Sequence, residues 1–103
     1  MAQQAKVNTA LISDNLFLGP QQSMTISWGI DNNNVWWFHA VPKISQSSFP
    51  RNIQIDKVRI ATTESTKFRA YIKITNPDPP MPTQEGWADG CYFRLYVAVA
   101  TPI

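Results

Sequence analysis

The chain has very few of the side chains on which most catalytic and metal sites depend. Its 103 residues include one cysteine, Cys91, and one histidine, His39. A single cysteine excludes a disulfide within the chain and a zinc site built from several thiolates. Nucleophilic catalysis needs a serine, cysteine or threonine beside a base, and no Gly-x-Ser-x-Gly run accompanies the one histidine. We therefore expect no enzyme, metal or cofactor, with acid–base chemistry by loop carboxylates as an open alternative.

Long apolar runs and a strong net charge are also missing. No apolar stretch approaches the roughly 18 residues that a membrane helix needs, so we expect no transmembrane segment. The first ten residues lack the charged start and apolar stretch of a secretory signal, which indicates a cytoplasmic protein or one released without a classical signal. The net charge of +2 is small beside that of nucleic-acid-binding domains, so no specific nucleic-acid partner is expected.

The sequence does have a recurring alternation of apolar and polar residues. This period of two is clearest in residues 23–30, 67–75 and 91–100, and weaker forms occupy residues 6–12 and 35–41. Successive side chains of a strand point to opposite faces, so each segment predicts a strand with one apolar face. No segment of ten or more residues shows a helical period.

Two further segments complete the expected fold. In residues 52–60 the apolar phase shifts, which predicts a β-bulge near Asp56 and Lys57, and residues 16–18 predict a short additional strand. Proline, glycine, asparagine and serine separate the segments. We expect one domain over residues 1–103, an all-β, two-layer antiparallel β-sandwich of about seven strands. It would be jelly-roll or immunoglobulin-like, with a partly open barrel as the alternative.

Four tryptophans are many for a chain of this size. Trp36 and Trp37 are adjacent in a predicted strand, so they cannot both enter the same core. The more apolar set of Trp36, Phe38 and Ala40 is expected to face inward, and Trp37 and His39 outward. An exposed tryptophan beside an imidazole suits the apolar face of a sugar ring or anchors a protein partner. The alternative is that both faces of this strand are buried.

The loops contribute the other predicted ligand-binding residues. The segment 76–90 is long and contains four prolines before Trp87 and Asp89, and long ordered loops often carry binding residues. Its alternative role is to let Trp87 close the end of the core. Residues 31–34 are read as a hairpin turn rather than a calcium loop, because no spaced ligand set or terminal glutamate follows. The predicted ligand-binding residues are Trp37, His39, Trp87, Asp89 and Asn33.

A second candidate surface combines aromatic and basic side chains. If residues 67–75 pair with residues 91–100, the polar faces of the two strands form one surface. Such a surface would suit anionic sugars, lipid head groups or single-stranded nucleic acid, and its alternative is an ordinary solvated face. Its members are Arg69, Tyr71, Lys73, Tyr92, Arg94 and Tyr96.

These features favour a non-catalytic binding module of carbohydrate-binding, lectin-like type, with glycans as its partners. The first alternative is a structural or assembly protein of a phage, virus or surface layer, in which exposed aromatic side chains are buried between the copies of a symmetric homo-oligomer. The second alternative is a β protein associated with a membrane surface or a pore.

Overall fold

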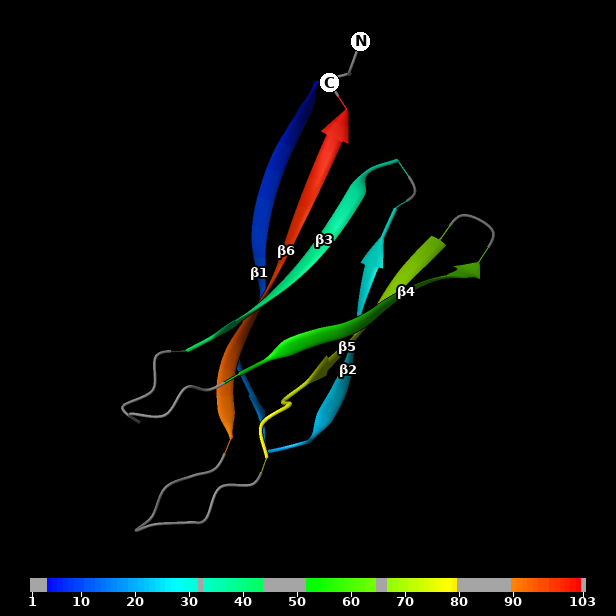
Figure 1. Cartoon of the computed structure of the whole chain (residues 1–103). Helices are drawn as coiled ribbons and strands as arrows, with labels where there is room; N and C mark the ends of the chain where they lie inside the picture. The colour runs from blue at the N-terminus through cyan, green and yellow to red at the C-terminus, as the bar shows by residue number, and fades with distance from the viewer. Residues whose placement is uncertain (1–3, 32, 44–51, 65–66, 80–89, 103) are drawn as a thin grey trace.

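The computed structural model describes residues 4–31, 33–43, 52–64, 67–79 and 90–102, which contain six β-strands and no helix (Figure 1). The strands are β1 (Ala5–Leu18), β2 (Ser23–Ile30), β3 (Val35–Pro42), β4 (Gln54–Glu64), β5 (Lys67–Thr75) and β6 (Cys91–Pro102). The prediction of about seven strands was one too many. Residues 16–18 are the end of β1, which continues past two register shifts between Leu11 and Leu16 instead of ending at its polar residues.

The strands form two antiparallel sheets of three strands each. Sheet A has the order β1-β6-β3 and sheet B has the order β2-β5-β4. The pairs are nested along the chain, because β1 pairs with β6 and β2 with β5. Only β4 and β5 are both consecutive and in the same sheet, so each of the remaining connections passes from one sheet to the other. The expected pairing of residues 67–75 with residues 91–100 was wrong for this reason.

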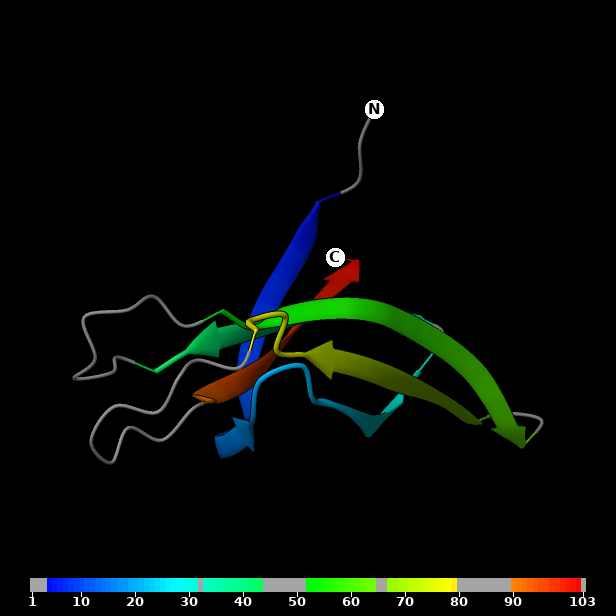
Figure 2. The ribbon, with the colours of Figure 1, turned by 60° about the horizontal axis from the view of Figure 1, so that its bottom comes forward.

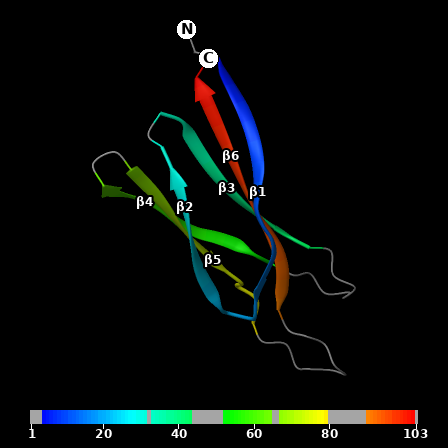
Figure 3. The ribbon, with the colours of Figure 1, turned by 180° about the vertical axis from the view of Figure 1, so that it is seen from behind.

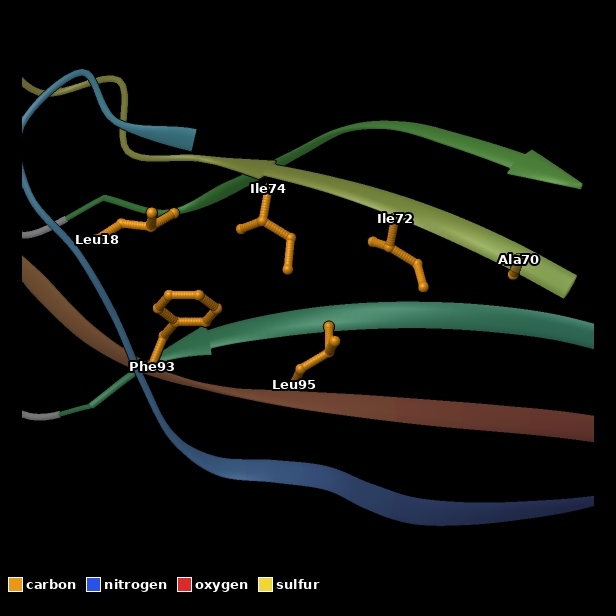
Figure 4. Packing of buried hydrophobic residues seen from close by; sticks show 6 residues of the cluster. All are labelled: Leu18, Ala70, Ile72, Ile74, Phe93 and Leu95. Carbon is orange, nitrogen blue, oxygen red and sulfur yellow. The ribbon is translucent and has the colours of Figure 1, made fainter. Parts of the chain in front are cut away.

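The core lies where the inner faces of the two sheets meet, near the end of β1 (Figure 4). Phe93 and Leu95 of β6 point toward Ile72 and Ile74 of β5, and Leu18 closes one end of the cluster. Phe93, Leu95, Ile72 and Ile74 are fully buried. The alternation of residues 67–75 and 91–100 therefore predicted the correct inner face in both sheets.

Away from this core the two sheets diverge, and one end of sheet A projects beyond sheet B (Figures 1 and 3). Figure 2 shows the start of β1 and the end of β6 extending together, away from β2, β4 and β5. Every residue from Gln4 to Leu11 is exposed. The first half of β1 is thus held by its pairing with β6, without cover from the other sheet.

Two local predictions concern the turns and bends. The β-bulge expected near Asp56 and Lys57 is confirmed by the register shift between Ile55 and Lys57. Two bonds support the turn expected at residues 31–34: a carboxylate oxygen of Asp31 accepts the backbone N–H of Asn33 at 2.9 Å and that of Asn34 at 3.0 Å. However, it joins β2 of sheet B to β3 of sheet A, so it is not a hairpin between paired strands.

Candidate functional site

The adjacent tryptophans of β3 divide between the two faces of sheet A as predicted. Phe38 and Ala40 pack against the core, and Trp36 shares their face and is half-buried. Trp37 is 51% exposed and His39 is exposed, both on the opposite, outer face. Any partner that contacts the exposed ring of Trp37 must therefore contact the outer face of sheet A.

That face is built from three cross-strand rows that run over β1, β6 and β3. The first row contains Val7, Ala100 and Val35. The second contains Thr9, Ala98 and Trp37, and the third contains Leu11, Tyr96 and His39. We call these nine residues the outer apolar face. Val7, Leu11 and Val35 are 47–59% exposed, so aliphatic side chains surround Trp37 on the surface.

An ionic cluster borders the outer apolar face and separates it from an aromatic pair. Arg94 donates from Nε to a carboxylate oxygen of Asp14 at 2.6 Å, and Lys43 lies 3.9 Å from the same oxygen. The hydrogen bond from Arg94, with a smaller contribution from Lys43, lowers the pKa of Asp14. Beyond this cluster the rings of Phe17 and Tyr92 lie 4.7 Å apart between centroids.

The lowered pKa of Asp14 sets the sign of one pH effect. Because its ordinary value is 3.8, the unfolded chain binds this proton before the folded chain does as the pH falls. The stabilising contribution is complete above 3.8 and is lost as the pH falls through the folded value. We expect the urea midpoint to fall more steeply on acidification at low salt in the wild type than in Asp14→Asn. Identical acid profiles for the two chains would contradict this role.

The predicted basic and aromatic surface is divided between the two sheets. Arg69, Tyr71 and Lys73 lie on the outer face of sheet B, and the other three residues, Tyr92, Arg94 and Tyr96, lie on the outer face of sheet A. The six therefore do not form one surface, which corrects the sequence-based expectation. The basic neighbours of Tyr71 and Lys73 come from β4, where Arg59 pairs with Tyr71 and Lys57 with Lys73. Sequence reasoning missed both.

The remaining predicted ligand residues are not brought to one place. Trp37 and His39 share the outer apolar face, two residues apart on β3. Asn33 is exposed in the turn before this strand. Trp87 and Asp89 lie outside the described residues. The structure thus places Trp37 on one face with His39 and with aliphatic side chains that the sequence analysis did not name.

The described residues were also compared with the requirements of metal sites and membrane-spanning helices. Within it, no three histidine, cysteine, aspartate or glutamate residues gather as a metal site would require. None of the secondary structure seen there is a helix of the length and apolarity needed to cross a membrane. The indole Nε1 of Trp36 is buried there without an acceptor.

The comparisons with known proteins give no assignment, because no family model, no curated protein and no solved structure matches this chain. The structure itself defines a class. It is an all-β protein of two antiparallel three-stranded sheets, with an apolar outer face on one sheet and a basic outer face on the other. The function has to be argued from these two faces.

Proposed function

We propose that this protein is a non-catalytic structural subunit that assembles with a second copy of itself through sheet A. The outer apolar face is the observation that carries this proposal. Its most exposed large side chains are Val7, Leu11, Val35 and Trp37, each 47–59% exposed. A contiguous apolar patch of this kind marks a site of interaction with another protein.

The free edge of β1 supports the choice of a second copy as the partner. This strand pairs with β6 along one edge only, and sheet A ends there. Edge strands that avoid pairing usually carry proline or several charges, whereas residues 5–11 contain no proline and one charged residue, Lys6. An antiparallel two-fold pair centred on Asn8 places Lys6 opposite Ala10 of the other copy rather than opposite its own counterpart. It also joins the two copies of sheet A into one six-stranded sheet, with both outer apolar faces on the same side.

The topology supports the same function at the level of fold. We propose that the two facing sheets form a β-sandwich whose nested order is that of a six-stranded jelly roll. Jelly rolls occur in capsid and lectin domains, so this analogy agrees with a structural role without specifying it.

Carbohydrate binding is the second candidate, because Trp37 is half exposed on the outer face of sheet A and His39 offers a hydrogen-bonding group on the same face. A sugar site needs several convergent polar groups. On the outer apolar face the neighbours of Trp37 are Thr9, Ala98 and aliphatic side chains. These surroundings favour a protein partner over a glycan.

A charge placed on the interface should separate the copies. We expect Val7→Lys to raise the dissociation constant of the dimer about tenfold, because a charge on an edge strand opposes pairing and the two new lysines lie diagonally across the strand pair. Light scattering across a concentration series measures this change. Thr25→Lys is the matched control, since Thr25 is exposed and lies on the outer face of β2 in sheet B, opposite Lys73. It should leave the mass unchanged.

The same samples distinguish the two candidate functions. Tryptophan fluorescence titrated with a broad glycan panel should show no sugar-dependent quenching in the wild type. A wild-type chain that stays monomeric and shows quenching abolished by Trp37→Ala would overturn assembly in favour of carbohydrate binding.

A further inference from the structure

The outer face of sheet B gathers basic side chains from two neighbouring strands. Lys57 pairs with Lys73, Arg59 pairs with Tyr71, and Arg69 occupies the next row along β5. These residues alternate with the buried Ala70, Ile72 and Ile74, so they point away from the core. We call Lys57, Arg59, Arg69, Tyr71 and Lys73 the basic face.

None of the four cations of the basic face forms an ion pair with a carboxylate of the described ranges. The nearby carboxylate, Asp56, accepts hydrogen bonds from the hydroxyl of Thr75 and the side-chain amide of Gln54. These bonds lower its pKa, and Lys73 contributes less. Directly opposed like charges such as Lys57 and Lys73 destabilise a sheet, and a bound anion relieves their repulsion.

The neighbouring strand β2 leaves this face accessible. Opposite Lys73, Tyr71 and Arg69 it places Thr25, Ser27 and Gly29 in turn. These short side chains stand beside longer basic ones, and the two hydroxyl groups are further hydrogen-bond donors. The face therefore combines lysine, arginine, serine and threonine, which are the side chains that usually contact phosphate oxygens.

The spacing and the stacking favour a polymeric ligand. Alternate residues of a strand are about 6.8 Å apart, so each strand presents cations in a line that suits a chain of repeating anions. The guanidinium carbon of Arg59 lies 4.4 Å from the ring centroid of Tyr71. The open side of a stacked guanidinium is a platform for an unpaired base.

From this arrangement we infer that the basic face binds the phosphate backbone of single-stranded nucleic acid. Tyr71 is its largest apolar side chain and is covered by Arg59, which favours this ligand over a bilayer, where inserted apolar side chains add to binding. The contacts are to the backbone, so binding is independent of base sequence. The site uses sheet B and does not depend on the assembly proposed for sheet A.

The test uses the full chain and a fluorescein-labelled oligothymidylate, followed by anisotropy in a salt titration. Four phosphate contacts give a slope of about −3 in log affinity against log salt concentration, at about −0.7 for each contact. Lys57→Gln with Lys73→Gln should halve this slope and weaken binding at least tenfold at low salt. Lys43→Gln, which removes a charge next to the end of β3 in sheet A, should change affinity by less than about twofold.

Three results would overturn the inference. The first is no anisotropy change for the wild type at low salt, and the second is an equal loss in Lys43→Gln. The third is a wild type that binds phosphatidylserine vesicles but not the oligonucleotide, together with a double variant that does not bind the vesicles. This result would assign the basic face to membranes. Unfolding followed by circular dichroism shows whether the variants fold. Lys57→Gln should not lower the midpoint, because it removes a like-charge pair.

Discussion

Replacing Phe93 with alanine is expected to destabilise the folded chain by about 3 to 5 kcal/mol. Phe93 is fully buried in β6 and lies opposite Leu16 of β1 and Pro42 of β3, so its ring covers the inner face of sheet A at the core. Its removal loses the burial of the ring and leaves a cavity against Ile74. A domain of this size has a free energy of unfolding of about 5 to 15 kcal/mol, so the variant should lose a large part of its stability. Urea unfolding followed by tryptophan fluorescence measures the change.

Tyr92 provides the matched control for this substitution. It precedes Phe93 in β6, is also aromatic, and faces outward with 53% of its surface exposed. Tyr92→Ala should cost about 1 kcal/mol, mainly through the lost contact with Phe17. Equal losses for the two variants would mean that the faces of β6 are assigned wrongly.

Asn76→Leu is expected to cost about 3 kcal/mol, although it makes the residue more apolar. Asn76 is fully buried and donates from Nδ2 to the carbonyl of Leu18 at 3.0 Å. Its Oδ1 accepts the backbone N–H of Asp78 at 2.9 Å. Its backbone also bonds to Gln21 and Gln22, so one residue ties the end of β5 to the β1–β2 turn. Leucine fills the space but removes the donor to the Leu18 carbonyl and the acceptor of the Asp78 N–H.

The same substitution at Asn33 separates this effect from a general loss of an amide. Asn33 is exposed, so Asn33→Leu should change the free energy of unfolding by no more than about 0.5 kcal/mol. Urea titration of both variants gives the comparison. A stability of Asn76→Leu equal to that of the wild type would contradict the role of Asn76 as the polar link between the strands.

Local alternation was sufficient to predict the core and the exposed ring. The apolar positions of β5 and β6 are set by the period of a single strand, which is why Ile72, Ile74, Phe93 and Leu95 were placed correctly. Adjacent tryptophans must point to opposite faces, so the exposure of Trp37 followed without knowledge of the fold.

Pairing between distant strands could not be obtained in this way. Neighbouring strands in sequence usually pair, but the chain crosses between the sheets after β5, so β4 rather than β6 supplies the partners of Tyr71. The bond between Arg94 and Asp14 spans 80 residues for the same reason. The burial of Asn76 depends on the end of β1, and nothing in its local sequence indicates it.

The central claim is that β1 pairs with β1 of a second copy and so continues sheet A from one copy into the other. Amide hydrogen exchange at Lys6 to Leu11, measured by NMR at increasing protein concentration, tests it most directly. In a single copy alternate amides of this segment bond to β6 and the others face the free edge. We expect all of them to become protected as the concentration rises. Exchange of the edge-facing amides at the rate of an unstructured peptide at every concentration would contradict the claim.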